Sequence, residues 1–239
     1  MTSHSHDPPA IKHFPDAAKY QGEIRRLVPG YDALHAMWPA LLPVALGSPA
    51  EARVLFVGAG PGDEVVALAQ AQPGWVIDAL EPSPSMAAAA RMAVESRDLT
   101  GRVRVHEVAM AGFEPTGEYD AVVTLLVGHF VADDGARAGF VDRIARALRP
   151  GGVAVLAEIE DDGQARQLMA AAHVAWARGA GLSEDRLEDM SSRLDHGFHM
   201  LTRDRLEELL RQAGLRHVVE FFRCFGVVGR LLDKADDRR

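Results

Sequence analysis

The stretch of sequence that decides the fold is Val54-Leu55-Phe56-Val57-Gly58-Ala59-Gly60-Pro61-Gly62-Asp63-Glu64. Four apolar residues lead into three alternate glycines, and an acidic pair then opens a helical pattern. This order predicts a strand, a tight turn and the start of a helix. Because Gly58, Gly60 and Gly62 have no side chains, the backbone of the turn can approach a ligand while the first amides of the helix point toward it.

A second predicted strand, Val76–Leu80, follows and ends at Glu81. A carboxylate at the tip of the strand beside such a turn is placed to hold the hydroxyl groups of a ribose. A dinucleotide-binding fingerprint would need glycine three positions after Gly60, and this chain has Asp63 there. The stretch therefore predicts a nucleoside-binding βαβ unit, with an NAD-linked reductase as the last alternative.

The composition of the chain is that of a soluble enzyme. Of its 239 residues, 48% are hydrophobic and 25% are charged. The formal net charge of −8 disfavours direct binding to nucleic acid. The polar start of the chain and the lack of a long apolar run predict a cytoplasmic protein without a membrane partner. Cys224 is the only cysteine, which excludes an internal disulfide and a cysteine zinc cluster.

Strand and helix patterns alternate along the chain, which predicts an α/β protein with a doubly wound, seven-stranded and mainly parallel sheet. The predicted strands are Arg53–Val57, Val76–Leu80, Val103–Val108, Asp120–Leu126, Val153–Glu158, His217–Phe222 and Gly226–Leu231. The last two are expected to pair antiparallel at one edge. Arg149-Pro150-Gly151-Gly152 is predicted to form a turn into the fifth strand.

Helices are expected on both sides of this core. Residues 1–12 are predicted to be a mobile arm, 13–46 a helical cap broken at Pro29-Gly30, 161–200 a helical insertion, and 202–231 a closing helix with the terminal hairpin. Thr202 is predicted to cap the closing helix. One domain over residues 1–239, with its cofactor-binding core at 53–158, is therefore predicted. The insertion and the apolar terminal strand offer surfaces for a homodimer.

The glycine turn, Glu81 and Leu148-Arg149-Pro150-Gly151-Gly152 together resemble motifs of the class I S-adenosylmethionine (SAM)-dependent methyltransferases. The resemblance implies a Rossmann-like methyltransferase fold, SAM as cofactor and S-adenosylhomocysteine as product. It also implies cofactor contacts from Gly58, Ala59, Gly60, Gly62, Glu81, Pro82, Ala109, Met110 and Leu125. The chain departs from the usual pattern at Phe56 and Ala109-Met110, where that superfamily often has acidic residues.

A narrower resemblance extends over almost the whole chain. Pro29-Gly30-Tyr31, Glu81-Pro82-Ser83-Pro84-Ser85-Met86, Arg193, Met200-Leu201-Thr202, Ala213-Gly214-Leu215 and Cys224-Phe225 are similar, in this order, to the carboxy-SAM synthase branch. That branch makes a carboxylated SAM, with a donor such as prephenate, for tRNA wobble-uridine modification. The resemblance implies that Tyr31 closes over the cofactor and that the planar guanidinium of Arg193 receives the extra carboxylate. Thr124-Leu125 and Pro82 stand where that branch has asparagines.

Three functions stay open at this point. The first is a methyltransferase that moves the methyl group of SAM to a small-molecule acceptor by in-line displacement. The second is an enzyme similar to carboxy-SAM synthase, and the third is a non-catalytic SAM-binding module. Displacement at an activated sulfonium needs orientation and exclusion of water rather than a catalytic triad.

Several single residues have alternative interpretations. His129, just after the fourth strand, lies where it could take a proton from the acceptor, or it is structural. His196 and His199 are predicted to line the substrate pocket rather than bind a metal. Arg193 could instead pair with Glu188 or Asp189 at the surface, and Tyr31 could pack on Trp38. The remaining candidates, expected to be structural, are His13, His35, His106, His173, His217 and Cys224.

Overall fold

The computed structural model describes residues 17–235, so the arm expected over residues 1–12 and the start of the cap at 13–16 lie outside the described residues. Seven strands form one sheet in the order β3-β2-β1-β4-β5-β7-β6. The strands are β1 Arg53–Val57, β2 Val76–Leu80, β3 Val103–His106, β4 Tyr119–Leu125, β5 Leu148–Ile159, β6 Leu215–Cys224 and β7 Val227–Lys234. The first five are parallel, and β7 runs antiparallel to both β5 and β6.

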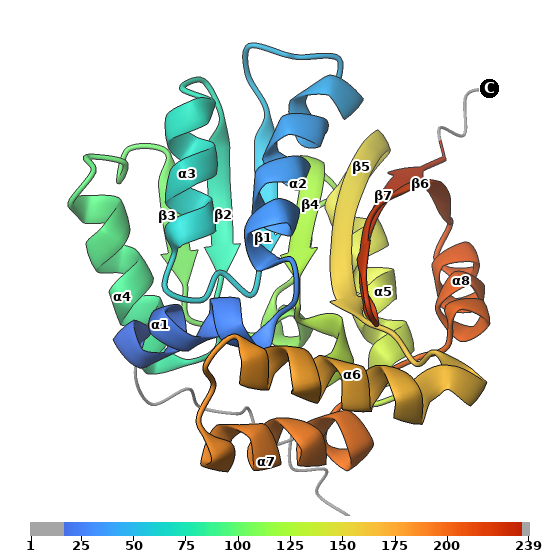
Figure 1. Cartoon of the computed structure of the whole chain (residues 1–239). Coiled ribbons are helices and arrows are strands. Elements are labelled where there is room, and N and C mark those ends of the chain that lie inside the picture. The colour runs from blue at the N-terminus through green and yellow to red at the C-terminus, as the bar shows by residue number, and fades with distance from the viewer. Residues whose placement is uncertain (1–16, 236–239) are drawn as a thin grey trace, which may run out of the picture.

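Helices cover both faces of the sheet and the carboxyl ends of its parallel strands (Figure 1). They are α1 Ala17–Leu27, α2 Tyr31–Ala45, α3 Asp63–Ala71, α4 Pro84–Glu95, α5 Ala136–Ala147, α6 Arg166–Gly179, α7 Glu184–Ser192 and α8 Arg203–Gln212. The helices α2 and α3 pack on one face, and α5 and α8 pack on the other. Beyond the strand ends lie α1, α6 and α7 (Figure 1).

The buried strands explain why their sequences are continuous apolar runs. Along β1, Val54 and Phe56 belong to the core under α2 and α3, whereas Leu55 and Val57 belong to the core under α5. A strand covered on both faces has no exposed side, so it shows no alternation of polar residues. The sheet order and its mainly parallel pairing confirm the predicted fold class.

The fifth strand differs from the prediction. Residues 149–152 were expected to form a turn, but β5 already begins at Leu148. The pairing of β4 with β5 shifts register between Tyr119 and Ala121, and Gly151 has a φ of 72°. An irregular strand start therefore accommodates Pro150 and Gly151, residues that ordinarily indicate a turn.

The helical insertion has the expected pair of helices, α6 and α7, followed by a π-helical turn, η4, at Arg193–Gly197. The predicted cap of α8 is confirmed, because Thr202 Oγ1 accepts a hydrogen bond from the Arg205 N–H. Within residues 17–235, no helix has both the length and the apolar character that crossing a membrane requires.

Candidate functional site

All three glycines of the turn adopt the left-handed backbone region, with φ of 78° at Gly58, 54° at Gly60 and 95° at Gly62. A Cβ atom on Gly58 would lie 2.3 Å from Val127 Cγ2, and one on Gly62 would lie 2.9 Å from Ala90 Cα. A Cβ atom on Gly60 would meet no atom within 4 Å. Packing therefore requires two of the glycines, whereas Gly60 faces the space where a ligand can approach.

A cavity of about 660 Å³ lies between this turn, α2 and the start of α3. Its volume falls within the roughly 300–1,000 Å³ of small-molecule sites. It is lined by Ile24, Arg25, Tyr31, Asp32, His35, Ala36, Trp38, Pro39, Phe56, Gly58, Ala59, Gly60, Pro61, Asp63, Glu64, Ala67, Leu125 and Leu126. Five residues predicted to contact the cofactor thus share one wall: Tyr31, Gly58, Ala59, Gly60 and Leu125.

One part of the cavity wall combines a phenol, an imidazole and a carboxylate. The Tyr31 hydroxyl donates a hydrogen bond of 2.6 Å to Glu64 Oε1, and His35 Nδ1 lies 3.3 Å from the same oxygen. The rings of Tyr31 and His35 are 3.9 Å apart, whereas Trp38 packs edge-on against Phe56. His35, which was expected to be structural, has its side chain in the cavity wall, and its role stays a prediction. Burial lowers the pKa of His35, and the negative charge of Glu64 opposes this shift.

The charged residues of the wall give it a negative net charge. Three carboxylates, those of Asp32, Asp63 and Glu64, face the cavity together with the single guanidinium of Arg25. Arg25 Nε donates a hydrogen bond of 2.8 Å to Asp32, so the cation is already paired. The wall therefore favours a ligand that carries positive charge.

Glu81 is buried next to the glycine turn. Its Oε2 accepts the Gly60 N–H at 2.8 Å, and its Oε1 accepts the Ser83 N–H at 2.9 Å. Burial raises the pKa of Glu81, and the two N–H donors oppose that shift. Glu81 therefore fixes the turn. Each carboxylate oxygen can accept more than one hydrogen bond, so these two contacts leave room for a ribose hydroxyl. The contact of Glu81 with a ribose stays a prediction.

Five other predicted cofactor residues do not line the cavity. They are Gly62, Pro82, Ala109, Met110 and Arg193. Met110 is buried in the core against which α5 packs. Arg193 Nε donates to the Asp189 carboxylate at 2.9 Å, which is one of the surface pairs considered as an alternative. Contacts from these five residues to a cofactor stay predictions.

Two of the three histidines predicted to serve the substrate, His129 and His199, meet near the ends of β4 and β5. His129 is 3% exposed, and its Nδ1 accepts the Ile159 N–H at 3.3 Å. Its ring packs against Phe130 and Phe198, and its carbonyl oxygen accepts the His199 N–H at 2.8 Å. His196 belongs to η4. None of the three lines the described cavity, and their roles stay predictions.

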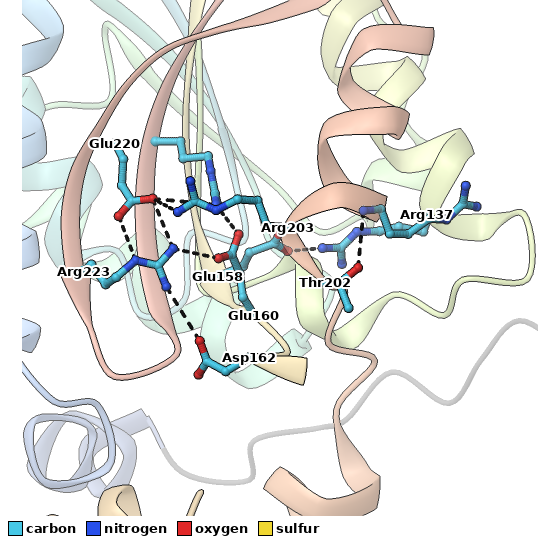
Figure 2. Close-up of polar contacts among 10 residues, drawn as sticks. Arg137, Glu158, Glu160, Asp162, Thr202, Arg203, Glu220 and Arg223 are labelled. Atoms are coloured by element: carbon cyan, nitrogen blue, oxygen red, sulfur yellow. Dashed lines mark hydrogen bonds and ion pairs between the residues drawn. The ribbon is translucent and has the colours of Figure 1, made fainter. Parts of the chain in front are cut away.

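A buried network of charges adjoins the loop after β4 (Figure 2). Arg137 of α5 pairs with Glu158 of β5, and each side chain is 1% exposed. Burial raises the pKa of Glu158, while Arg137 opposes the shift. Beside this pair, Arg230 contacts Glu160, and Arg223 donates to Glu160 at 3.0 Å (Figure 2). This network is absent from the predictions made from the sequence, although a glutamate inside an apolar strand, such as Glu158, indicates a buried partner.

The pair of Arg137 and Glu158 holds the short helical turn η2, Gly128–Phe130. A Cβ atom on Gly128 would lie 2.2 Å from Glu158 Oε2 and 2.8 Å from Arg137 Nη2. Only glycine can therefore pass this close to the ion pair. The turn η2, which begins the loop after β4, thus packs directly against a buried salt bridge.

Residues 55–154 match the family profile described as "Methyltransferase domain". The chain carries a methyltransferase domain. It is 26% identical over 218 residues to the carboxy-S-adenosyl-L-methionine synthase of Photorhabdus laumondii, covering 90% of this chain and 85% of that protein. That name agrees with the branch expected from the sequence.

Two solved structures show the same fold. An O-methyltransferase family protein from Burkholderia thailandensis superposes with a TM-score of 0.61 at 16% identity, covering 87% of this chain and 59% of that one. A phosphoethanolamine N-methyltransferase from Haemonchus contortus, in complex with SAM, superposes with a TM-score of 0.55 at 18% identity, covering 74% of this chain and 36% of that one. The methyltransferase domain thus has the Rossmann-like SAM-dependent methyltransferase fold predicted from the sequence.

Proposed function

We propose that this methyltransferase domain transfers the methyl group of SAM to a small-molecule acceptor. The observation that carries the proposal is the cavity above the glycine turn, because its net negative wall suits SAM. At neutral pH SAM has a sulfonium and an ammonium group against one carboxylate, so it is a net cation. The open side of Gly60 lets the backbone approach such a ligand.

The residues of the cavity divide the tasks of such a transfer. The glycine turn at 58–62 would hold the methionine end, with Glu81 keeping the turn in place through the Gly60 N–H. Trp38, Phe56 and Leu125 present apolar surface to the cavity and would exclude water. When bound, the cofactor supplies a methyl group already activated on sulfur, so the protein's main contribution is orientation.

A second candidate, carboxy-SAM synthesis, is favoured by the curated relatives, which span most of this chain. That reaction would need a cation for the additional carboxylate. Arg193 pairs with Asp189 outside the cavity wall, and Arg25 in the wall pairs with Asp32. The geometry therefore supports methyl transfer better.

The mass of the small molecule released on denaturing the purified protein tests this proposal. We expect SAM or S-adenosylhomocysteine, and we expect Arg193→Ala to bind SAM within about threefold of the unmodified protein by calorimetry. A carboxylated SAM, lost in Arg193→Ala, would establish the second candidate instead. Failure of the protein to bind SAM would refute both. SAM binding without turnover on any acceptor would leave the non-catalytic module.

The expected setting of the protein also remains a proposal: a cytoplasmic homodimer that acts on a small molecule and binds neither nucleic acid nor membranes. The net charge of −8 supports the lack of a nucleic-acid partner. Exposed apolar side chains on the insertion (Leu168) and on the edge strand β6 (Val218, Val219) support a surface for a second copy. A mass near 25.9 kDa by light scattering would contradict the dimer.

A further inference from the structure

We propose that Glu64 is the residue that selects the acceptor, and that the acceptor is an amine. This inference rests on the proposed methyl transfer and names the class of substrate for the same cavity. Three features of the wall carry it: the position of Glu64, the balance of charge around it and the aromatic faces beside it.

Glu64 is held rigidly at the mouth of the glycine turn. It is the second residue of α3, and the N-terminal end of a helix stabilises negative charge. Its side chain is only 18% exposed. The Tyr31 hydroxyl from α2 donates to its Oε1 at 2.6 Å, and His35 Nδ1 lies 3.3 Å from that oxygen. A carboxylate fixed from two helices in this way is a preorganised partner for a cation.

The other charges of the wall are more strongly screened by solvent. Asp32 is 75% exposed and pairs with Arg25, which is 60% exposed, and Asp63 is exposed as well. Glu64 is therefore the least exposed carboxylate of the wall, and its attraction for a ligand is the least weakened by water. An anionic phenolate or carboxylate acceptor would be repelled there, whereas an ammonium would be attracted.

Aromatic rings complete the environment for an ammonium group. Tyr31 and His35, whose ring planes are tilted by 35°, and the buried Trp38 line the same cavity as Glu64. The Arg25 guanidinium already lies over the Tyr31 ring, 5.5 Å from its centroid, so this part of the wall is suited to a cation. Amines have a pKa near that of lysine, about 10.4, so they arrive protonated and pair with the carboxylate.

The reaction balances without a further reagent. The ammonium gives its proton to solvent through the Glu64 carboxylate, which exposes the nitrogen lone pair. The nitrogen then forms a bond to the methyl carbon as the carbon–sulfur bond breaks, and the electron pair of that bond passes to sulfur. The positive charge that was on sulfur is now on the methylated nitrogen, and Glu64 can hold this product until it leaves.

Calorimetry on the protein loaded with S-adenosylhomocysteine tests the inference without requiring turnover. The probes are phenethylamine, 4-methylphenol and phenylacetate, which share an aromatic ring and differ in charge. We expect phenethylamine to bind at least about tenfold more tightly than the other two. Glu64→Gln, which keeps an acceptor for the Tyr31 hydroxyl, should abolish this preference when S-adenosylhomocysteine is held at a saturating concentration. Glu51→Gln is the matched control, because Glu51 is exposed before β1, away from the cavity.

Methyl transfer to tyramine, which has both a phenol and an amine, gives a second readout. Mass spectrometry should find the methyl group on nitrogen, with transfer lost in Glu64→Gln. O-methylation, equal binding of the three probes, or a preference that survives Glu64→Gln would overturn the inference while SAM binding still stands. If the unmodified protein binds no SAM, the proposed function itself fails.

Discussion

Gly58 and Gly60 adopt similar left-handed conformations for different physical reasons. At Gly58, Val127 occupies the space that a Cβ atom would need, so glycine is required by packing. At Gly60 the same space is open and adjoins the cavity, so packing does not require glycine there, and its contact with a ligand stays a prediction. The sequence indicated that both glycines matter. It could not separate their roles, because Val127 reaches the turn only through the tertiary structure.

Alanine substitutions at these two positions should therefore have separable effects. Either alanine costs about 1–2 kcal/mol for the left-handed backbone. Gly58→Ala should lose a further 1–3 kcal/mol or so by crowding Val127. Gly60→Ala should instead raise the Kd for SAM by about tenfold or more. Urea denaturation measures the first effect and calorimetry the second.

The double variant Gly58→Ala/Val127→Ala is the control for crowding, and it should recover part of the lost free energy of unfolding. Equal losses of stability at the two glycines, or unchanged SAM binding by Gly60→Ala, would show that the division of roles is wrong.

At the scale of elements, the loop after β4 is positioned by α5 and β5 together. Arg137 and Glu158 meet beneath Gly128, and the contact is fully buried. Two charges removed from water in this way gain little net stability as a pair, but either one alone is strongly destabilising. The pair therefore fixes where the loop lies more than it adds to stability.

Removing one charge of this pair should destabilise the protein more than removing both charges. Arg137→Met leaves the Glu158 carboxylate buried without its partner, and we expect a loss of about 3–5 kcal/mol in the free energy of unfolding. The double variant Arg137→Met/Glu158→Gln should be more stable than Arg137→Met alone. Urea denaturation of the two variants measures this difference. A double variant that is no more stable than Arg137→Met would contradict coupling between the two residues.

Elements were predicted well where the apolar run and its boundaries agree. The strands β1 and β2 have their predicted limits, because buried runs there end directly at glycine or at Glu81. The prediction failed at Arg149-Pro150-Gly151-Gly152, where turn-forming residues continue a strand through a register shift. The η4 turn at Arg193–Gly197 also escaped prediction, since its sequence has no signal that separates it from the end of α7.

At the scale of the whole molecule, the insertion is joined to the N-terminal helices through His173. This residue of α6 is 4% exposed, and its Nε2–H donates a hydrogen bond of 2.8 Å to the carbonyl oxygen of Leu27, the last residue of α1. Its ring stacks on Phe225 from the β6–β7 turn. One imidazole therefore connects three parts of the chain that are distant in sequence.

This contact should make stability depend on pH near neutrality. Burial lowers the pKa of His173 below its usual value near 6.5, so the folded protein binds this proton less readily than the unfolded chain does. The contribution of neutral His173 to the free energy of unfolding is complete above about pH 6.5. It is lost as the pH falls toward the lowered pKa, by at most about 1.4 kcal/mol per pH unit. His173→Gln should reduce this loss between pH 7.5 and 5.5 in urea denaturation.

The exposed His217 supplies the comparison, since His217→Gln removes a histidine without a buried contact. An identical decline in all three proteins would exclude His173 as the source.

The candidate site was predicted in part. The glycine turn and Tyr31 follow from sequence because the motif is local and specific. The roles of His35 and Glu64 could not be predicted from the sequence, because these residues lie on different helices and meet only when α2 packs over the start of α3. A histidine on an apolar helix gives no sign of what it will face.

The place of β7 between β5 and β6 has a consequence for biosynthesis. The ribosome synthesises β5 and β6 before β7. Neither strand can therefore pair with β7 until residues 227–234 emerge. Until then β5 has an unpaired edge, and Glu160 lacks the guanidinium of Arg230. A nascent chain paused before this point would present an open strand edge to chaperones, and the final pairing would close it.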